Sequence, residues 1–191
     1  MKQNSLVLKL KSLINSFLDF SEVIVLSAFI VILIFTFITK IVVVEGNSMN
    51  STLYNKDKLL ITHMFYTPEV DDIVVINSEA LNETIVKRVI AVSGQRVSID
   101  YDNETVRVDG KLLNESYTSE YIMDTGRFDR SFYNEETKTY EYVVPENCIF
   151  VMGDNRNHST DSRAFGFVSV SDVVGKVYFR ISSPYGDLGF I

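Results

Sequence analysis

Hydrophobic residues are distributed in two different ways along the chain, and the change falls near residue 45. Residues 23–39 contain no charged side chain, and as a helix at about 1.5 Å per residue they would span roughly 25 Å. Lys40 can place its ammonium at a membrane interface, so the apolar residues 41–44 extend the run. This length and composition predict a transmembrane anchor over residues 23–44.

Two alternatives for this apolar segment fit its pattern less well. A core helix normally has one polar face, whereas both faces are apolar here. A cleaved secretory signal has a shorter apolar core and small residues at the cut, whereas this run continues directly into Val42, Val43, Val44 and Glu45. We therefore expect an anchor that is retained.

The positively charged residues indicate how the anchor is oriented. Lys2, Lys9 and Lys11 precede it, and the side of a span with more Lys and Arg tends to remain in the cytoplasm. Residues 1–22 are therefore expected in the cytoplasm and residues 45–191 outside it. Lysines on the far side of the span reduce this charge difference.

After residue 45 the pattern is that of short strands separated by turns. Apolar and β-branched residues occur in brief runs, and Asn, Asp and Gly separate them. An Asp102-Asn103 turn between two alternating runs predicts a β-hairpin, and residues 113–142 are polar, rich in tyrosine and without clear periodicity. We expect a mostly β domain with strands at residues 58–62, 72–76, 84–92, 96–100, 104–108, 148–152 and 173–181.

Composition and charge exclude several classes of function. Apolar residues make up 46% of the chain, enough for a sizeable core, and the net charge is −7. Nucleic-acid binding requires clustered Lys and Arg, so we expect no nucleic-acid partner. Cys148 is the only cysteine, and His63 and His158 are the only histidines. Since no H-E-x-x-H pattern occurs either, we expect no internal disulfide, no metal site and no cofactor.

Residues 45–53 contain the first candidate for chemistry. Ser48 follows Gly46 and Asn47, and such a turn can present a hydroxyl and its backbone N–H in an exposed conformation. By itself, this pattern is more typical of an ordinary loop serine.

Lys87 is the second candidate. It lies in an apolar run, and a period of two places it on one face of a strand with Ile85 and Val89. Desolvation lowers the pKa of a lysine, and a neutral lysine can accept the proton of a serine hydroxyl. The alternative is a lysine at a strand edge, exposed to water.

Residues 153–166 form the third candidate, because they are dense in charged and hydroxyl side chains directly after an apolar run. In an extended backbone, Asp161 could pair with Arg163, and Asp154 could pair with Arg156 at the same spacing. A solvated turn is the simpler alternative.

Together these segments resemble the bacterial type I signal peptidases. The likeness covers most of residues 45–176, leaving out residues 99–144. Residues 153–166 contain G-D-N-R, then S-x-D-S-R and a glycine, at the family spacing. The family's lysine segment is similar to Lys87-Arg88-Val89-Ile90, and its serine segment is similar to Ser48-Met49 with Thr52-Leu53.

The resemblance implies a membrane-anchored serine protease with a Ser–Lys pair. Ser48 would be the nucleophile, and Lys87 would be the general base and then the acid toward the leaving amine. The supporting residues would be Ser159, whose hydroxyl holds the lysine ammonium, Asp161, which pairs with Arg163, and Met49, which neighbours the nucleophile.

The resemblance also implies a fold and two partners. The expected fold is a largely antiparallel β core with a small β-rich insertion at about residues 99–144. The expected substrates are secretory preproteins, cut after small residues at the first and third positions before the scissile bond. The lipid bilayer is the second partner, and the sequence does not indicate an oligomeric state.

Several positions depart from the family pattern. Ser51 stands where the family usually has proline, so its loop is less restricted. Gly46 stands where some members have a serine that serves as an oxyanion donor, so the oxyanion hole must rely on the Ser48 backbone N–H. Ala91, Ser93 and Gln95 replace a glycine, a proline and an aspartate after the lysine.

Three other interpretations remain to be tested. A Ser–His mechanism could use His158 or His63, although the family members that use histidine carry it at the position of Lys87. Self-cleaving repressors related by fold also use a Ser–Lys pair, but they join it to a DNA-binding domain. A membrane-anchored binding protein that has lost activity is the third, motivated by Ser51 and Gln95.

Overall fold

The computed structural model describes residues 2–62, 66–124, 126, 128–185 and 188–191. The chain divides into two units, Met1–Thr39 and Lys40–Ile191. His63, one of the two histidines considered for catalysis, lies outside the described residues.

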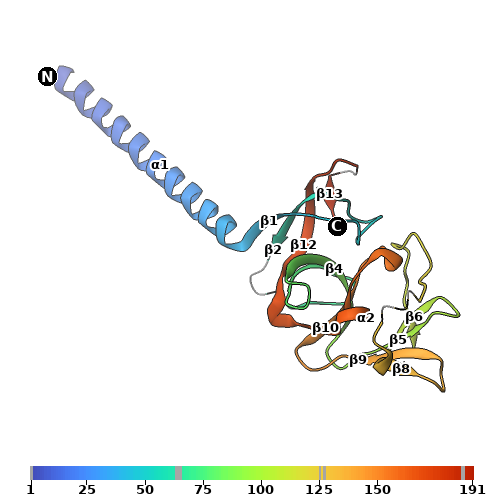
Figure 1. Ribbon diagram of the computed structural model, residues 1–191. Coiled ribbons are helices and arrows are strands. Elements are labelled where there is room, and N and C mark those ends of the chain that lie inside the picture. Colours follow the sequence, from blue (N-terminus) through green and yellow to red (C-terminus); the bar gives the residue numbers. More distant parts are fainter. Residues whose placement is uncertain (1, 63–65, 125, 127, 186–187) are drawn as a thin grey trace. The chain divides into compact units, whose positions relative to one another are not determined.

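The first unit is a single helix, α1 (Lys2–Ile38), drawn in blue in Figure 1. Its segment Lys11–Leu33 has a mean hydropathy of 2.1 and is long and apolar enough to cross a membrane. Ser27 and Thr36 donate their hydroxyl hydrogens to the carbonyls of Val23 and Ile32, so neither hydroxyl requires water. The transmembrane anchor over residues 23–44 stays a prediction.

The helix ends earlier than the apolar run. Residues Thr39–Val43 form strand β1, because consecutive β-branched side chains favour an extended backbone over a helix. The last residues of the expected anchor therefore belong to a sheet.

The second unit contains two β-sheets. The larger one has the order β1, β2 (Lys58–Thr62), β12 (Val173–Ser182), β3 (Ile73–Ser78), β4 (Glu83–Val92), β10 (Cys148–Met152) and β11 (Val168–Ser169), with β13 (Gly189–Phe190) paired to β12. The strand pairs with a described register are all antiparallel. The expected mostly β fold with antiparallel sheets and one N-terminal apolar helix is confirmed.

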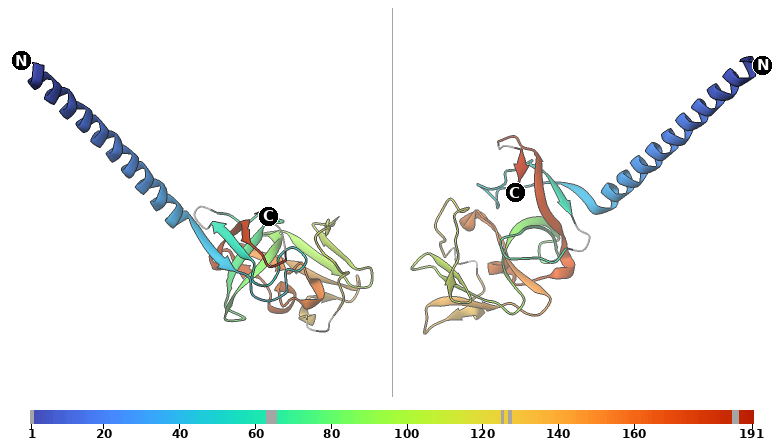
Figure 2. Two further views of the ribbon diagram at one scale, coloured as in Figure 1. Left: turned by 90° about the horizontal axis from the view of Figure 1, so that it is seen from above. Right: turned by 180° about the vertical axis from the view of Figure 1, so that it is seen from behind.

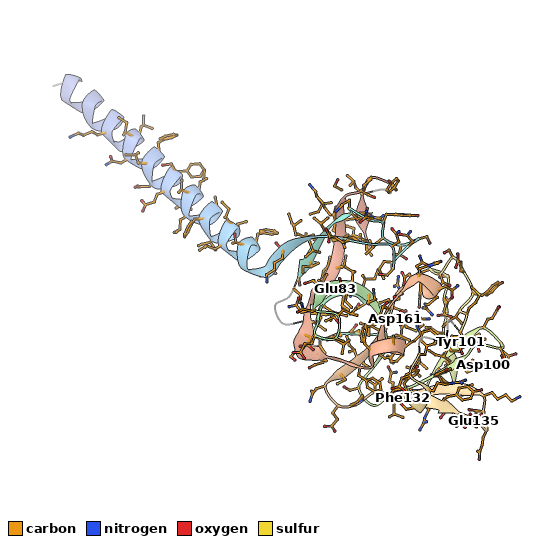
Figure 3. The ribbon with its side chains drawn as sticks, in the orientation of Figure 1. Glu83, Asp100, Tyr101, Phe132, Glu135 and Asp161 are labelled. Carbon is orange, nitrogen blue, oxygen red and sulfur yellow. The ribbon has the colours of Figure 1, made fainter. Side chains whose placement is uncertain are left out.

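The smaller sheet has the order β7 (Lys111–Leu112), β6 (Thr105–Val108), β5 (Arg96–Asp100), β9 (Thr139–Val143) and β8 (Tyr133–Asn134). Strands β5 and β6 form the predicted hairpin, and Asp100 accepts a hydrogen bond from the backbone N–H of Asn103 in its turn. This sheet starts at Arg96, slightly before the expected insertion. Its strands lie together in Figure 1, and Figure 3 labels Tyr101, which follows β5, and Phe132, which precedes β8.

Strand β4 changes partners along its length, and this matters for the site. Its residues Glu83 to Arg88 pair with β3, and Arg88 to Val92 pair with β10, with a register shift between Phe150 and Val151. Such irregularities bend a strand, and the green ribbon of β4 is strongly curved in Figure 2. Among the described residues, the edge of residues 83–87 that faces away from β3 is unpaired.

The buried apolar residues form three clusters. One joins the two sheets through Ile90 and Phe150 on one side and Val97 and Tyr142 on the other. A second includes Met49 and Leu53 from the loop after β1, packed with strand residues. The third includes Val74, Ile85, Val89 and Val151. Burying a Leu or Met side chain contributes about 1.5–3 kcal/mol, so the second cluster fixes the loop that carries Ser48.

Candidate active site

Ser48 lies in a loop that is anchored on both sides. Met49 is almost fully buried in the core, and Gly46 adopts a φ of 87°, a left-handed conformation that a glycine takes readily. The Asn155 backbone N–H donates to the Ser48 carbonyl at 3.0 Å, and the Asn155 side chain donates to the Asn47 carbonyl at 3.0 Å. The Ser48 side chain is therefore presented from a fixed backbone.

Lys87 reaches the Ser48 hydroxyl from strand β4. Its Nζ lies 2.7 Å from Ser48 Oγ, and the residue is only 4% exposed. Burial lowers the pKa of Lys87; Asp161, Glu83 and Asp154 oppose this shift, and Arg163 adds to it. Of the two alternatives for this lysine, the buried position is the one observed.

The Ser48 hydroxyl and the Lys87 amine border a cleft. Its volume is about 620 Å³. The walls come from the end of β1 and the loop after it, from the start of β4, and from the segment after β10. The lining residues include Val42, Ser48, Glu83, Ile85, Val86, Lys87 and His158. A cleft between two strand segments is suited to an extended peptide.

Asp161 and Arg163 form a buried pair behind the cleft. Arg163 donates from Nε to Asp161 Oδ1 at 2.7 Å and from Nη2 to Asp161 Oδ2 at 2.8 Å, and both residues are buried. The backbone N–H of Gly153 also donates to this carboxylate at 3.0 Å. Figure 3 labels Asp161 just before the short helix α2 (Ser162–Phe165).

The predicted pairing of Asp161 with Arg163 is observed, but its backbone differs from the expected one. Residues Ser162–Phe165 form one helical turn, and Asp161 caps it by accepting from the Arg163 backbone N–H. Burial alone would raise the pKa of Asp161, but the Arg163 guanidinium and the hydrogen bonds outweigh it and lower this pKa. The carboxylate therefore stays charged beside Lys87.

The predicted pairing of Asp154 with Arg156 is wrong. Asp154 accepts from Arg88 Nε at 2.9 Å and from Arg88 Nη2 at 2.7 Å. Arg156 instead pairs with Glu115 and donates to the Gly153 carbonyl. Residues Arg156–His158 form a 3₁₀ turn and not an extended segment, so the two-residue spacing does not place the two side chains on one face of a strand.

Asp154 connects the two halves of the site. It accepts from the Thr52 hydroxyl at 2.5 Å, in the segment that carries Ser48. It also binds Arg88, the neighbour of Lys87 on β4. From the sequence, Thr52 and Arg88 had no assigned role, and Asp154 had only the pairing with Arg156. The available signal was Arg88, a second charged residue directly after Lys87 in an apolar run. The two-residue period of a strand places it on the face opposite to Lys87.

Ser159 lies close to the Ser48 backbone. A Cβ added at Gly153 would collide with both the Ser48 carbonyl and the Ser159 side chain, so Gly153 allows these two segments to meet. Within the part of the chain that the structure describes, Ser159 does not form the hydrogen bond to Lys87 that the resemblance implies. Among the described residues, the buried Ser159 Oγ has no hydrogen-bond partner, although it lies near enough to Asp161 to help lower the pKa of that carboxyl.

The residues that depart from the family pattern make contacts of their own. Gln95 accepts from the Val92 backbone N–H at 2.9 Å and donates to Asp109 at 3.1 Å. Ser93 donates to the Cys148 carbonyl at 3.3 Å, and Ala91 is fully buried between the sheets. These contacts hold the turn from β4 to β5 in place.

Other chemistries find less support at this cleft. His158 lines it and is exposed, but in the described part of the chain no hydrogen bond joins it to Ser48. No three His, Cys, Asp or Glu side chains among the described residues lie together in a way that could hold a metal ion.

Comparisons with known proteins extend over most of the chain. The model of the family described as "Signal peptidase, peptidase S26" matches residues 17–182. A signal peptidase I from Bacillus caldolyticus is 42% identical over 144 residues, which cover 72% of this chain and 76% of the relative. Signal peptidase I P from Bacillus subtilis subsp. natto is 34% identical over 166 residues, which cover 84% and 86% of the two chains. A crystal structure of a signal peptidase I from Enterococcus faecalis is 29% identical, with a TM-score of 0.45, and covers 58% of this chain and 97% of that chain.

Proposed function

Because the chain belongs to the signal peptidase family, peptidase S26, we propose that it is a membrane-anchored serine endopeptidase in which Ser48 and Lys87 cut signal peptides from secreted preproteins. Family membership confirms the resemblance found in the sequence and implies removal of signal peptides by a serine protease. The roles of individual residues are our proposal.

One observation carries the assignment of the catalytic pair. A buried lysine amine lies 2.7 Å from a serine hydroxyl that borders a cleft. Burying an ammonium is costly unless the pKa falls, and burial lowers the pKa of Lys87. A neutral amine at hydrogen-bond distance from a hydroxyl is the arrangement that general-base activation of a serine requires.

The first half of the reaction forms an ester. Neutral Lys87 accepts the Ser48 proton while Ser48 Oγ attacks the scissile carbonyl carbon. The negative charge on the substrate oxygen is stabilised by the Ser48 backbone N–H, since Gly46 has no hydroxyl to contribute. The Lys87 ammonium then donates its proton to the leaving amine, the C–N bond breaks, and the mature protein departs.

The second half of the reaction regenerates the enzyme. Neutral Lys87 accepts a proton from water, the resulting hydroxide attacks the ester, and the Ser48 oxygen leaves and takes back the proton. Asp161 and Arg163, which face Lys87, keep their mutual pairing throughout. The Asp161 carboxylate stabilises the ammonium when it forms, because it raises the pKa of Lys87, whereas the Arg163 guanidinium lowers that pKa.

The unpaired strand edge supports a peptide substrate. Residues 83–87 of β4 line the cleft opposite Val42 and Val43 from the end of β1. An extended peptide can add to such an edge through main-chain hydrogen bonds. By resemblance to the family, the peptide is the end of a signal peptide, with small residues at the first and third positions before the cut.

The apolar helix supports attachment to the membrane. Lys11–Leu33 has the length and composition of a span, and we propose that the anchor lies in α1 and ends before Thr39, because residues 39–43 of the predicted anchor belong to strand β1. By the positive-inside rule, the lysines before it favour a cytoplasmic location for residues 1–22 and an extracytoplasmic one for residues 45–191. Ser48 follows the end of the anchor closely in sequence, where a preprotein with its apolar segment still in the bilayer would present its cleavage site.

Cleavage of a preprotein by the purified full chain in detergent tests this function. N-terminal sequencing of the product should identify a cut after a small residue. Ser48→Ala and Lys87→Ala should each lower kcat/KM by at least about 10³-fold while circular dichroism stays unchanged. Failure of the wild type to cut, under conditions where an active signal peptidase I does, would instead support a binding protein. Replacing both histidines with glutamine should leave the cleavage rate unchanged. A loss of cleavage in this variant would favour a Ser–His mechanism.

A further inference from the structure

A segment of the chain between β7 and β8 covers the loop that follows β10. Glu115 forms an ion pair with Arg156, whose side chain is buried. Asn157 donates to Glu120 at 3.1 Å and accepts from the Met123 backbone N–H at 3.0 Å. We call residues 115–123 the covering segment. It is joined to residues 156 and 157 of the loop that also supplies Asp154 and Ser159.

Tyr117, in the middle of the covering segment, lies directly over Arg88. The Arg88 guanidinium carbon is 3.9 Å from the centre of the Tyr117 ring, and the Arg156 guanidinium carbon is 5.7 Å from it. The Tyr117 hydroxyl accepts a hydrogen bond of 3.4 Å from Arg156 Nη2. A guanidinium over an aromatic face is attracted by the ring, and more strongly when water is excluded.

Tyr117 completes the surroundings of Arg88. In its own plane, Arg88 donates to Asp154 through Nε and Nη2 and to the Asp71 carbonyl through Nη1. The ring therefore contacts the guanidinium face, which the in-plane hydrogen bonds leave free. An ion pair such as Arg88–Asp154 keeps its geometry as long as water is excluded from it.

Arg88 and Asp154 in turn connect to both members of the catalytic pair. Arg88 follows Lys87 on β4, and Asp154 accepts from Thr52 in the segment that carries Ser48. A shift of Arg88 would be transmitted to Lys87 along the strand and to Ser48 through Asp154 and Thr52. Errors of about 1 Å in such placement can lower a rate about 100-fold.

We propose that Tyr117 is a positioning residue for the reaction, which closes over the Arg88–Asp154 pair and thereby fixes the separation of Ser48 and Lys87. This inference rests on the proposed function for its kinetic consequences. The covering segment would thereby support the catalytic centre from outside the cleft.

The location of Tyr117 separates this role from general packing and from substrate binding. Tyr117 is partly exposed and belongs to none of the three described apolar clusters. Neither Tyr117 nor Arg88 is among the residues that line the cleft. Loss of the ring should therefore lower kcat and leave KM nearly unchanged.

The test compares Tyr117→Leu, Tyr117→Phe and Tyr121→Leu in the full chain in detergent. Tyr121 belongs to the same segment, but its side chain is 75% exposed, so its replacement controls for effects on the segment. Tyr117→Leu should lower kcat about 10- to 100-fold with KM within about twofold. Tyr117→Phe keeps the ring over Arg88 and should retain most of the activity, and Tyr121→Leu should behave as the wild type.

A second readout does not depend on turnover. Titration of lysine side chains labelled with ¹³C at Cε reports the pKa of Lys87, assigned by the signal missing from Lys87→Ala. The charged groups that face Lys87 are Asp161, Glu83, Asp154 and Arg163, and burial is the main reason that its pKa is low. In Tyr117→Leu, water admitted near Arg88 and Asp154 should raise the pKa of Lys87 toward its ordinary value. The acidic limb of the rate profile should move in the same direction.

The outcomes distinguish the two proposals. If the wild type does not cleave, the proposed function fails, and the titration still decides whether Tyr117 affects the Lys87 environment. If the wild type cleaves and Tyr117→Leu keeps its kcat and the Lys87 pKa, the role of Tyr117 is disproved. An equal loss in Tyr117→Leu and Tyr121→Leu would also overturn it, because the effect would then belong to the segment as a whole.

Discussion

Lys87 Nζ lies 2.7 Å from Ser48 Oγ, although one residue comes from a loop and the other from the middle of a curved strand. The loop is fixed by the burial of Met49 and by the hydrogen bond from Asn155 to the Ser48 carbonyl. The strand is fixed by its pairing with β3 and by the Arg88–Asp154 ion pair. The distance is therefore set by the surrounding structure and does not depend on a flexible side chain alone.

Replacing Lys87 with arginine should abolish activity. A guanidinium remains protonated at any pH at which the protein is folded, so it cannot accept the Ser48 proton. We expect kcat/KM for a preprotein to fall by at least about 10³-fold. Lys87→Ala should be equally inactive, since it removes the base without adding a charge. Appreciable turnover by Lys87→Arg would contradict a neutral amine as the base.

The lowered pKa of Lys87 predicts how activity and stability depend on pH. Burial is the main cause of the shift, and the base works only when neutral, so kcat/KM should rise as pH increases through the pKa of folded Lys87. Between that pKa and the ordinary value of 10.5, the unfolded chain binds a proton that the folded chain does not. Stability therefore increases with pH in this interval.

Lys87→Met should be inactive but more stable than the wild type. It removes the desolvated amine, and gains of this kind are about 0.5–2 kcal/mol. The gain should be largest below the pKa of folded Lys87, where folding must bury an ammonium, and should shrink toward pH 10.5. Thermal unfolding at several pH values measures this difference. A stability gain that does not change with pH would show that burial of the Lys87 ammonium does not destabilise the folded protein.

Gly153→Ala should damage both stability and activity. The added Cβ would collide with the Ser48 carbonyl and with the Ser159 side chain, and such overpacking costs about 1–3 kcal/mol. Because the Ser48 backbone must move, kcat should fall more than KM rises. Gly189→Ala is the matched control, since nothing lies within 4 Å of its added Cβ. If Gly153→Ala cleaves as well as Gly189→Ala, the contact between these segments is not tight.

Several strands could be predicted from the sequence, because local periodicity and the turn residues at their ends are sufficient to define them. The runs at 58–62, 96–100 and 148–152 coincide with β2, β5 and β10, since each is short, β-branched and bounded by turn residues. The region of residues 113–142 was less predictable. Its contacts are long-range, such as those of Glu115 and Tyr117 with Arg156, and local periodicity does not reveal such contacts.

The candidate site was predictable in its residues but less so in its pairings. Sequence spacing suggested that Asp154 pairs with Arg156, whereas the actual partner is Arg88 on another strand. Spacing reports only local geometry, and a buried carboxylate takes the partner that tertiary packing brings nearest. The Ser159 hydroxyl also differs from the expectation. The resemblance implies that it forms a hydrogen bond to Lys87, and this bond is not formed in the described structure.

Ser159→Ala should lower activity without lowering stability. The Ser159 Oγ is buried, and among the described residues it has no hydrogen-bond partner, so its removal should leave stability unchanged or slightly raised. The hydroxyl becomes useful only when Lys87 is protonated during the reaction, since the new ammonium then requires acceptors in a site closed to water. We expect kcat to fall about 10- to 100-fold, and Ser159→Thr, which keeps the hydroxyl, to retain more activity than Ser159→Ala. Kinetics and thermal unfolding of both variants measure this; unchanged kcat in Ser159→Ala would show that the carboxylates of Asp161, Glu83 and Asp154 stabilise the Lys87 ammonium without the hydroxyl.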